Sequence, residues 1–144
     1  MSSTCQRAKC GAIIVKDGQV IGKGSNSFPG NDERQCRCSN SKDDYDKKVT
    51  DKTCCVHAEQ RAVMDALKNN ADKLEGSRLY FARFHSDGEG SLLGGERQLY
   101  CTICTKMMYD VGIAEFILPH RDGICVYPKD EYLNNSYDYG KIND

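Results

Sequence analysis

One histidine and two cysteines, in two short stretches of the chain, have the side chains and the spacing to hold a metal ion. His57 and Glu59 stand two residues apart, and a Cys-x-x-Cys pair follows at Cys101 and Cys104. An imidazole and two thiolates supply three ligands of a tetrahedral zinc ion and leave the fourth position for water. Glu59 is a carboxylate that can move protons beside the metal without binding it. The four residues together predict a catalytic zinc centre.

This centre requires helix starts at both stretches. Side chains two positions apart inside a helix point to different sides, so His57 and Glu59 can face one metal only from a first turn. We expect a helix from His57 to about Leu67, with an apolar stripe that includes Val56, Val63 and Leu67.

A second helix is expected to start at the Cys-x-x-Cys pair, to run from Cys101 to about Val111 and to end at Gly112. The positive ends of the two helix dipoles would then converge on the metal and favour thiolates over thiols. The metal is therefore expected to lie between two helix starts.

Five apolar segments are expected to form the strands that carry these helices. Residues 11–15 and 19–24 are joined by a turn with an Asp-Gly pair, which is a strong signal of a β-hairpin. Residues 78–84 form a third strand because they are rich in aromatic and apolar side chains. Residues 114–118 and 124–127 are too close for a parallel crossover, so they are predicted to pair as an antiparallel hairpin.

Two other segments and several single side chains invite interpretation. The tyrosine-rich tail, residues 128–144, could form a short helix over the sheet or the site. The glycine-rich insertion, residues 85–99, lacks a phosphate-loop motif and is expected to form a loop at the rim of the site. Phe28 either stacks on a planar group of a ligand or anchors a loop. Basic side chains that could meet a phosphate group, or simply be solvated, are Arg7, Lys9, Lys23, Arg34 and Arg37.

Composition limits the class of protein. The chain has 144 residues, of which 39% are hydrophobic, so we expect a single domain over residues 1–144. A formal net charge of -1 and a pI near 6.3 argue against a globally basic nucleic-acid binder. The N-terminus lacks an apolar signal core and no apolar run has the length of a membrane span. A cytoplasmic protein without membrane association is expected.

Nine cysteines are many for this length, and their odd number fits poorly with a closed set of disulfides. In a reducing compartment such cysteines are metal ligands or small apolar residues. A long polar segment contains Cys36 and Cys38 and ends at Cys54 and Cys55. These four thiolates could hold a second, structural zinc ion. The alternative is a set of thiols in a loop.

The pattern H-x-E followed by P-C-x-x-C is the signature of zinc-dependent base deaminases, although Tyr100 stands at the proline position. With residues 10–18 and Gly24-Ser25-Asn26 in the same order, the chain resembles the cytidine and deoxycytidylate deaminase superfamily over most of residues 9–127. The first half resembles the deoxycytidylate branch most closely. The final hairpin is similar instead to the branch that acts on free nucleosides.

The resemblance implies an α/β fold, a three-layer α/β/α sandwich in which a five-stranded mixed sheet carries helices on both faces. It implies that the histidine and the two cysteines named above bind Zn²⁺ and that Glu59 shuttles protons. By position, Asn26 would contact the sugar, and the backbone N–H of Ala58 would contact the pyrimidine carbonyl. Members of the family commonly form homo-oligomers, so self-association is expected.

Three hypotheses follow for the function. The first is hydrolytic deamination of a small cytosine nucleoside or nucleotide, of dCMP or cytidine type, with release of ammonia. The second keeps this chemistry and takes cytosine or another base in single-stranded DNA or RNA, with tyrosines to stack on bases. The third is a non-catalytic zinc-binding domain of the same fold.

Overall fold

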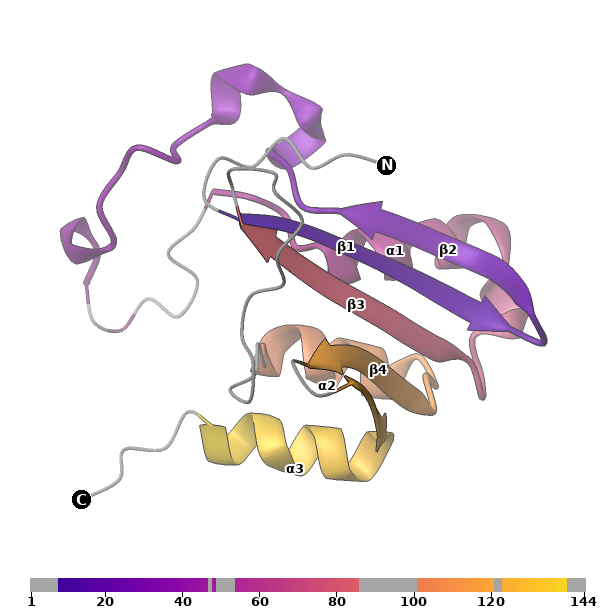
Figure 1. The fold of residues 1–144 in the computed structure, drawn as a ribbon. Coiled ribbons are helices and arrows are strands. Elements are labelled where there is room, and N and C mark those ends of the chain that lie inside the picture. Colours follow the sequence, from indigo (N-terminus) through magenta and orange to yellow (C-terminus); the bar gives the residue numbers. More distant parts are fainter. Residues whose placement is uncertain (1–7, 47, 49–53, 86–100, 121–122, 140–144) are drawn as a thin grey trace.

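The computed structural model describes residues 8–46, 48, 54–85, 101–120 and 123–139. A five-stranded sheet with strand order β2-β1-β3-β4-β5 forms the centre of the molecule (Figure 1). The strands are β1 (Ala8–Lys16), β2 (Gln19–Ser25), β3 (Arg78–His85), β4 (Glu115–His120) and β5 (Gly123–Pro128). The α-helices are α1 (Ala58–Asn69), α2 (Thr102–Asp110) and α3 (Lys129–Tyr139), and the short 3-10 turns are η1 (Pro29–Asn31), η2 (Glu33–Gln35), η3 (Lys42–Asp44) and η4 (Ala71–Lys73).

The first hairpin is confirmed, with β1 and β2 antiparallel and Lys16 opposite Gln19. Its two turn residues, Asp17 and Gly18, have φ angles of 50° and 78°. Two positive φ angles in succession are what a type I′ turn requires, and Asp-Gly adopts them at low cost. The twist of this turn matches the twist of the strands that it joins.

The final hairpin is also confirmed. Strand β4 runs parallel to β3, whereas β5 is antiparallel to β4, with His120 opposite Gly123. The sheet is therefore mixed, as predicted. A link this short cannot return the chain to the start of a neighbouring parallel strand, so the antiparallel arrangement follows from its length.

Alternate residues of the strands face a single helical layer. Leu79 of β3 lies beside Phe116 of β4, and both belong to one buried core with residues of α1 and α2. In the part of the chain that the structure describes, α1, α2 and α3 pack against this face, and no helix covers the opposite face. The second helical layer that the resemblance implied is thus not seen among these residues.

Helix α1 packs against β2 through small residues. Its buried residues include Ala58, Ala62, Val63 and Ala66. The predicted stripe is wrong at one position, because Leu67 is 48% exposed. Small side chains face the sheet because the helix backbone lies against strand glycines, and a leucine would not fit at that distance.

Residues 129–139 of the tail form α3, in line with the short helix expected there. Tyr132 of α3 is buried and stacks on Phe116, with ring centroids 4.5 Å apart. The hydroxyl of Thr102, the first residue of α2, donates a hydrogen bond to the Ser136 carbonyl at 3.2 Å. Helix α3 therefore covers the end of the sheet and supports α2. None of the described helices has the length and apolar character of a membrane span.

Candidate metal centre

His57 is the residue immediately before α1, with extended backbone angles (φ -69°, ψ 148°). Its backbone N–H donates to Oε1 of Gln60 at 3.0 Å, which ties the start of the helix to its first turn. The neighbouring Val56 exchanges two backbone hydrogen bonds with Ser27, at 2.8 and 3.3 Å. The imidazole thus sits on a backbone that is fixed from both sides.

Cys101 occupies the corresponding position before α2. Its Sγ accepts a hydrogen bond from the backbone N–H of Cys104 at 3.5 Å, and its carbonyl accepts from Thr105 N at 2.8 Å. The spacing of three residues brings both sulfur atoms to the same end of the helix. Both helix starts agree with the sequence prediction.

The structure brings His57, Cys101 and Cys104 together, with their ligand atoms all within 4.8 Å of one another. Nδ1 of His57 lies 3.1 Å from Sγ of Cys104. Cys104 is buried, whereas the other two are partly exposed, so one side of the cluster faces outward. One nitrogen and two sulfur ligands with an accessible fourth side match the donor set of an open zinc site.

The electrostatics of the cluster favour a thiolate. Hydrogen bonding to Cys104, and then to His57, lowers the pKa of Cys101 to about 4, although its burial acts in the opposite direction. A deprotonated sulfur is the form that binds a metal.

Glu59 lies in the first turn of α1, two residues after the imidazole. It is only 7% exposed. Burial raises the pKa of its carboxyl to about 7, while the charge of His57 lowers it and that of Cys101 raises it. A carboxyl with this pKa can both accept and release a proton near neutral pH.

The family model for the cytidine and deoxycytidylate deaminase zinc-binding region matches residues 1–119 of this sequence. The chain belongs to this deaminase family. This confirms the predicted resemblance.

Two solved structures have a similar fold, and both are of the dCMP deaminase from the cyanophage S-TIM5. The apo form is 22% identical, with a TM-score of 0.52, over 88% of this chain and 74% of that one. The form in complex with dCMP and dUMP is 21% identical, with a TM-score of 0.52, over 88% of this chain and 75% of that one. No curated protein sequence matches significantly.

The sugar-binding residue that the deaminase resemblance suggested is buried and firmly held. Asn26 is 8% exposed, and its Oδ1 accepts a hydrogen bond from Cys10 N at 2.9 Å. The next residue, Ser27, pairs with Val56, so Asn26 and His57 are joined through a short backbone bridge. Ala58 is buried at the first position of α1, where a backbone N–H has no acceptor within the helix.

Arg61 is a residue beside the site whose role was not predicted from the sequence. This side chain reaches from α1 to the segment after β2, where it donates to the Phe28 carbonyl at 2.7 Å and to Oδ1 of Asn31 at 2.8 Å. The residue follows His57 by four positions and therefore lies one turn further along the same side of the helix. That spacing was the signal in the sequence, but its acceptors are far away in the chain.

The remaining candidates fall into two groups. Phe28 is 6% exposed and packs against Cys55, which favours its interpretation as a loop anchor. Arg34 forms a bidentate hydrogen-bonded pair with Asp32, with a shortest distance of 2.8 Å, so its charge is compensated locally. Arg7 and the insertion over residues 86–99 lie outside the described residues, as does Tyr100.

Proposed function

We propose that this chain, acting as one domain, is a zinc-dependent hydrolytic deaminase that converts a cytosine nucleotide to its uracil form. The observation that carries the proposal is the meeting of His57, Cys101 and Cys104 at two helix starts, with a buried Glu59 in the same turn. These positions match the signature of base deaminases. Family membership supports the same reaction.

The residues have separate tasks in this reaction. His57, Cys101 and Cys104 would hold one Zn²⁺ ion, which lowers the pKa of water that binds to it. Hydrolysis adds water to C4 of the base and releases ammonia, so protons must reach N3 and the departing amine. Glu59 is placed to carry these protons, because its buried carboxyl lies in the first turn of α1, two residues from the metal ligand His57.

The substrate we propose is a monophosphate of the dCMP type, with cytidine-type nucleosides as the alternative. Support comes from the fold shared with a phage enzyme that was solved with dCMP and dUMP. Asn26 and the Ala58 N–H are proposed to contact the sugar and the pyrimidine carbonyl. We propose a cytoplasmic location and self-association as part of the same function.

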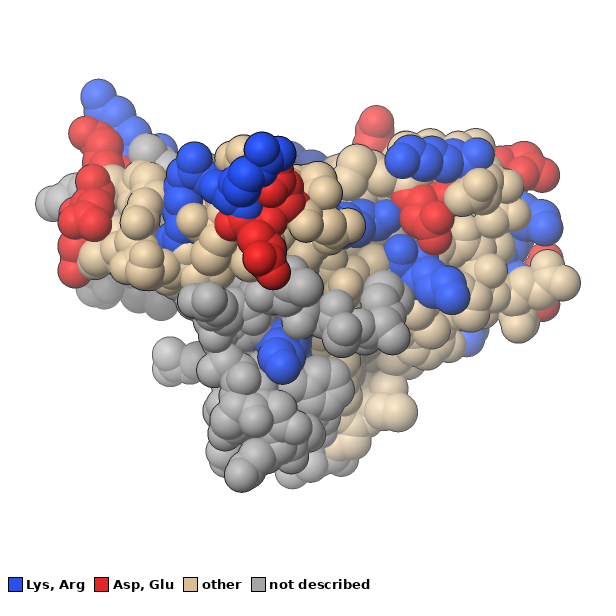
Figure 2. Space-filling view, turned by 90° about the horizontal axis from the view of Figure 1, so that it is seen from above, with Lys and Arg blue, Asp and Glu red and all other residues tan. Residues whose placement is uncertain are grey.

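The distribution of charge on one face of the molecule argues against the alternative of a single-stranded nucleic-acid substrate. Figure 2 shows Lys and Arg side chains next to Asp and Glu side chains over the described part of this face. A binder of nucleic acid uses a groove of one sign. The mixed charge favours a small substrate.

The test is ammonia release from a panel of cytidine, deoxycytidine, their 5′-monophosphates and a cytosine-bearing oligonucleotide. We expect turnover of dCMP with one equivalent of ammonia and dUMP formed per dCMP consumed. Glu59→Gln should reduce kcat by a factor on the order of 10² or more, the range for loss of a general acid–base group. Glu131→Gln, on the exposed side of α3, is the matched control and should keep full activity.

Two outcomes would contradict the proposal. Turnover that survives Glu59→Gln would remove the proton-transfer role from this residue. Zinc-loaded, folded protein without turnover of any compound in the panel would instead support a non-catalytic domain.

A further inference from the structure

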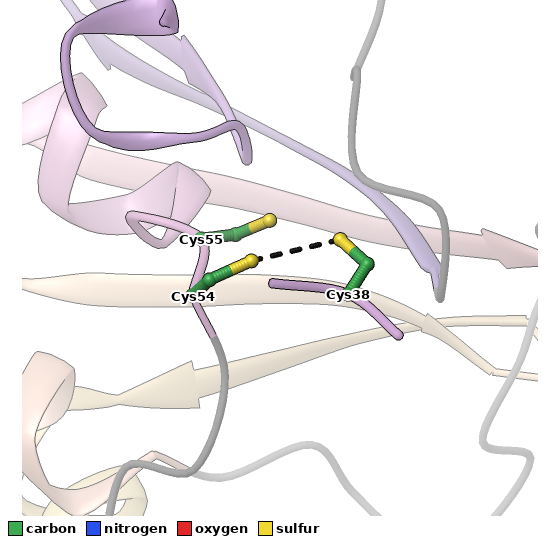
Figure 3. A group of neighbouring side chains, drawn as sticks. All are labelled: Cys38, Cys54 and Cys55. Carbon is green, nitrogen blue, oxygen red and sulfur yellow. Dashed lines mark hydrogen bonds between the residues drawn. The ribbon is translucent and has the colours of Figure 1, made fainter. Parts of the chain in front are cut away.

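A second cluster of thiols lies in a part of the chain that the deaminase reaction does not use. The sulfur atoms of Cys38, Cys54 and Cys55 all lie within 4.8 Å of one another. Figure 3 shows the three sulfur atoms pointing toward one another, with Cys38 on one segment and the Cys54–Cys55 pair on the segment that enters α1. Residues far apart in the sequence are thus brought to one point.

The spacing of the sulfur atoms suits a shared metal. Sγ of Cys38 lies 3.6 Å from Sγ of Cys54. A disulfide bond is about 2.05 Å long, so these atoms are too far apart to be bonded. Two sulfurs at about 2.3 Å from one tetrahedral zinc ion are about 3.8 Å apart. The observed separation is close to this second value.

The backbone also supports a charged sulfur at Cys54. The N–H of Arg37 donates a hydrogen bond to Cys54 Sγ at 3.2 Å. Hydrogen bonds to an ionised acceptor are stronger than those to a neutral one, and outer-shell bonds of this kind orient metal ligands. The donor comes from the Cys36–Cys38 segment, so the bond joins the two sides of the cluster.

Cys36 is the candidate for a fourth ligand. It is partly buried and packs against the cluster formed by Phe28 and Cys55, together with Cys38 and Cys54. Four thiolates make a closed tetrahedral site, which is typical of structural zinc and leaves no position for a substrate.

The segment from Pro29 to Asp46 needs such a cross-link because it has no hydrophobic core of its own. From Pro29 to Asp46, no residue whose side chain is described is buried, and the regular structure consists of three short 3-10 turns. A segment without buried apolar side chains gains little from the hydrophobic effect, and metal binding can supply the missing free energy of folding.

We propose that Cys36, Cys38, Cys54 and Cys55 bind a second, structural zinc ion that fastens the segment after β2 to the start of α1. Cys55 is followed by Val56, which pairs with Ser27 beside Asn26. The site therefore holds together the two chain segments that carry the metal ligand His57 and the proposed sugar contact.

The test is the zinc content of the full chain by native mass spectrometry, with elemental analysis as a second measurement. We expect two zinc ions per wild-type chain. Cys54→Ser and Cys38→Ser should each retain one, and Cys104→Ser should also retain one because the second site remains. Cys125→Ser, in β5 and outside both clusters, is the matched control and should retain two.

Cobalt separates the two sites spectroscopically. Co²⁺ bound to Cys104→Ser should show the intense thiolate charge-transfer bands of a four-sulfur site, and these bands should disappear in a Cys104→Ser, Cys54→Ser double variant. Trypsin should cleave after the exposed Arg34 and Arg37 several-fold faster in Cys54→Ser than in Cys125→Ser.

A count of one zinc ion per wild-type chain, with the same count in Cys54→Ser, would overturn the proposal. The wild-type count is decisive here, so the result does not depend on whether a variant folds. A Cys38–Cys54 disulfide, found by mass spectrometry after the thiols are blocked during isolation, would overturn it as well. Neither outcome touches the proposed deaminase reaction, which depends on the first zinc ion and on Glu59.

Discussion

The raised pKa of Glu59, a buried carboxyl at the start of α1, lowers the stability of the metal-free protein near neutral pH. Burial raises the pKa of Glu59 from 4.5 to about 7. An acid with a raised pKa in the folded state binds a proton more tightly there than in the unfolded state. Below pH 4.5 the carboxyl is protonated in both states and does not affect stability. As the pH rises from 4.5 through about 7, only the unfolded state releases the proton readily, so the free energy of unfolding falls. Glu59 should thus weaken the metal-free fold at neutral and alkaline pH.

This predicts a pH-dependent effect of Glu59→Gln on the metal-free protein. The difference between a pKa of 4.5 in the unfolded state and about 7 in the folded state corresponds to a destabilisation of about 3 kcal/mol. The variant should match the wild type near pH 4.5 and be more stable by up to this amount above about pH 8. Urea unfolding with a chelator present measures the difference. A constant difference at all pH values would show that Glu59 does not titrate in this range.

Arg61 offers a second test at the residue level. Its guanidinium donates to two acceptors in the segment after β2, Phe28 O and Asn31 Oδ1. Lysine keeps the charge but cannot reproduce the planar fork of donors. Arg61→Lys should lower the free energy of unfolding by about 1 to 2 kcal/mol and raise KM more than it lowers kcat, because the segment leads from Asn26.

A matched substitution provides the comparison. Arg78 has a 55% exposed side chain and lies 3.4 Å from Glu115, so its pairing is a surface interaction of small energy. Arg78→Lys should change neither stability nor KM measurably. If Arg61→Lys likewise leaves the free energy of unfolding and KM unchanged, then Arg61 contributes only its charge.

At the level of elements, the close approach of α1 to β2 positions the candidate metal centre. A Cβ atom built on Gly24 would lie 2.5 Å from the carbonyl oxygen of Ala58, and one on Gly22 would collide with the carbonyl of Ala62. Both obstacles are backbone atoms, which cannot rotate away. The two glycines therefore let the first turn of α1, which contains Glu59 and directly follows His57, rest on the strand.

Gly24→Ala should displace that first turn. We expect a loss of about 3 kcal/mol in the free energy of unfolding, the upper part of the range for overpacking, together with weaker zinc binding. Gly11→Ala in β1 is the control, since no heavy atom outside its chain neighbours lies within 4 Å of the added Cβ. Thermal unfolding and zinc titration of both variants give the answer. Unchanged zinc affinity in Gly24→Ala would show that helix contact with β2 does not hold the ligands in place.

The elements also show how far the sequence alone could go. A local signal was sufficient for the Asp-Gly turn, because turn type depends on neighbouring residues. The two helix starts followed from the metal ligands instead, because residues two positions apart can face one metal only from a first turn. The exposure of Leu67 was not predictable, since it depends on how close α1 comes to β2. The hydrogen-bond acceptors of Arg61 were not predictable either, because they lie 30 and 33 residues away in the chain.

At the scale of the molecule, the sheet face that no described helix covers bears on self-association. Among the described residues the face opposite the helices carries an apolar groove of about 350 Å³, lined by side chains such as Ile13, Tyr80 and Ile117. At its edge, Ile124 is 74% exposed and Val126 is 54% exposed, next to each other on one side of β5. Contiguous exposed apolar surface is characteristic of protein–protein contacts.

We therefore expect homo-oligomers to form through this face, in line with the self-association proposed above. Ile124→Asp should reduce the molar mass measured by light scattering to that of one chain, because a carboxylate would be desolvated in the contact. Leu67→Asp is the control: Leu67 is also an exposed apolar residue, at 48%, but it lies on α1, which packs against β2 at the other edge of the sheet. If both variants keep the wild-type mass, the apolar face serves another purpose. If both dissociate, the contact includes α1, and the helical layer rather than the sheet joins the subunits.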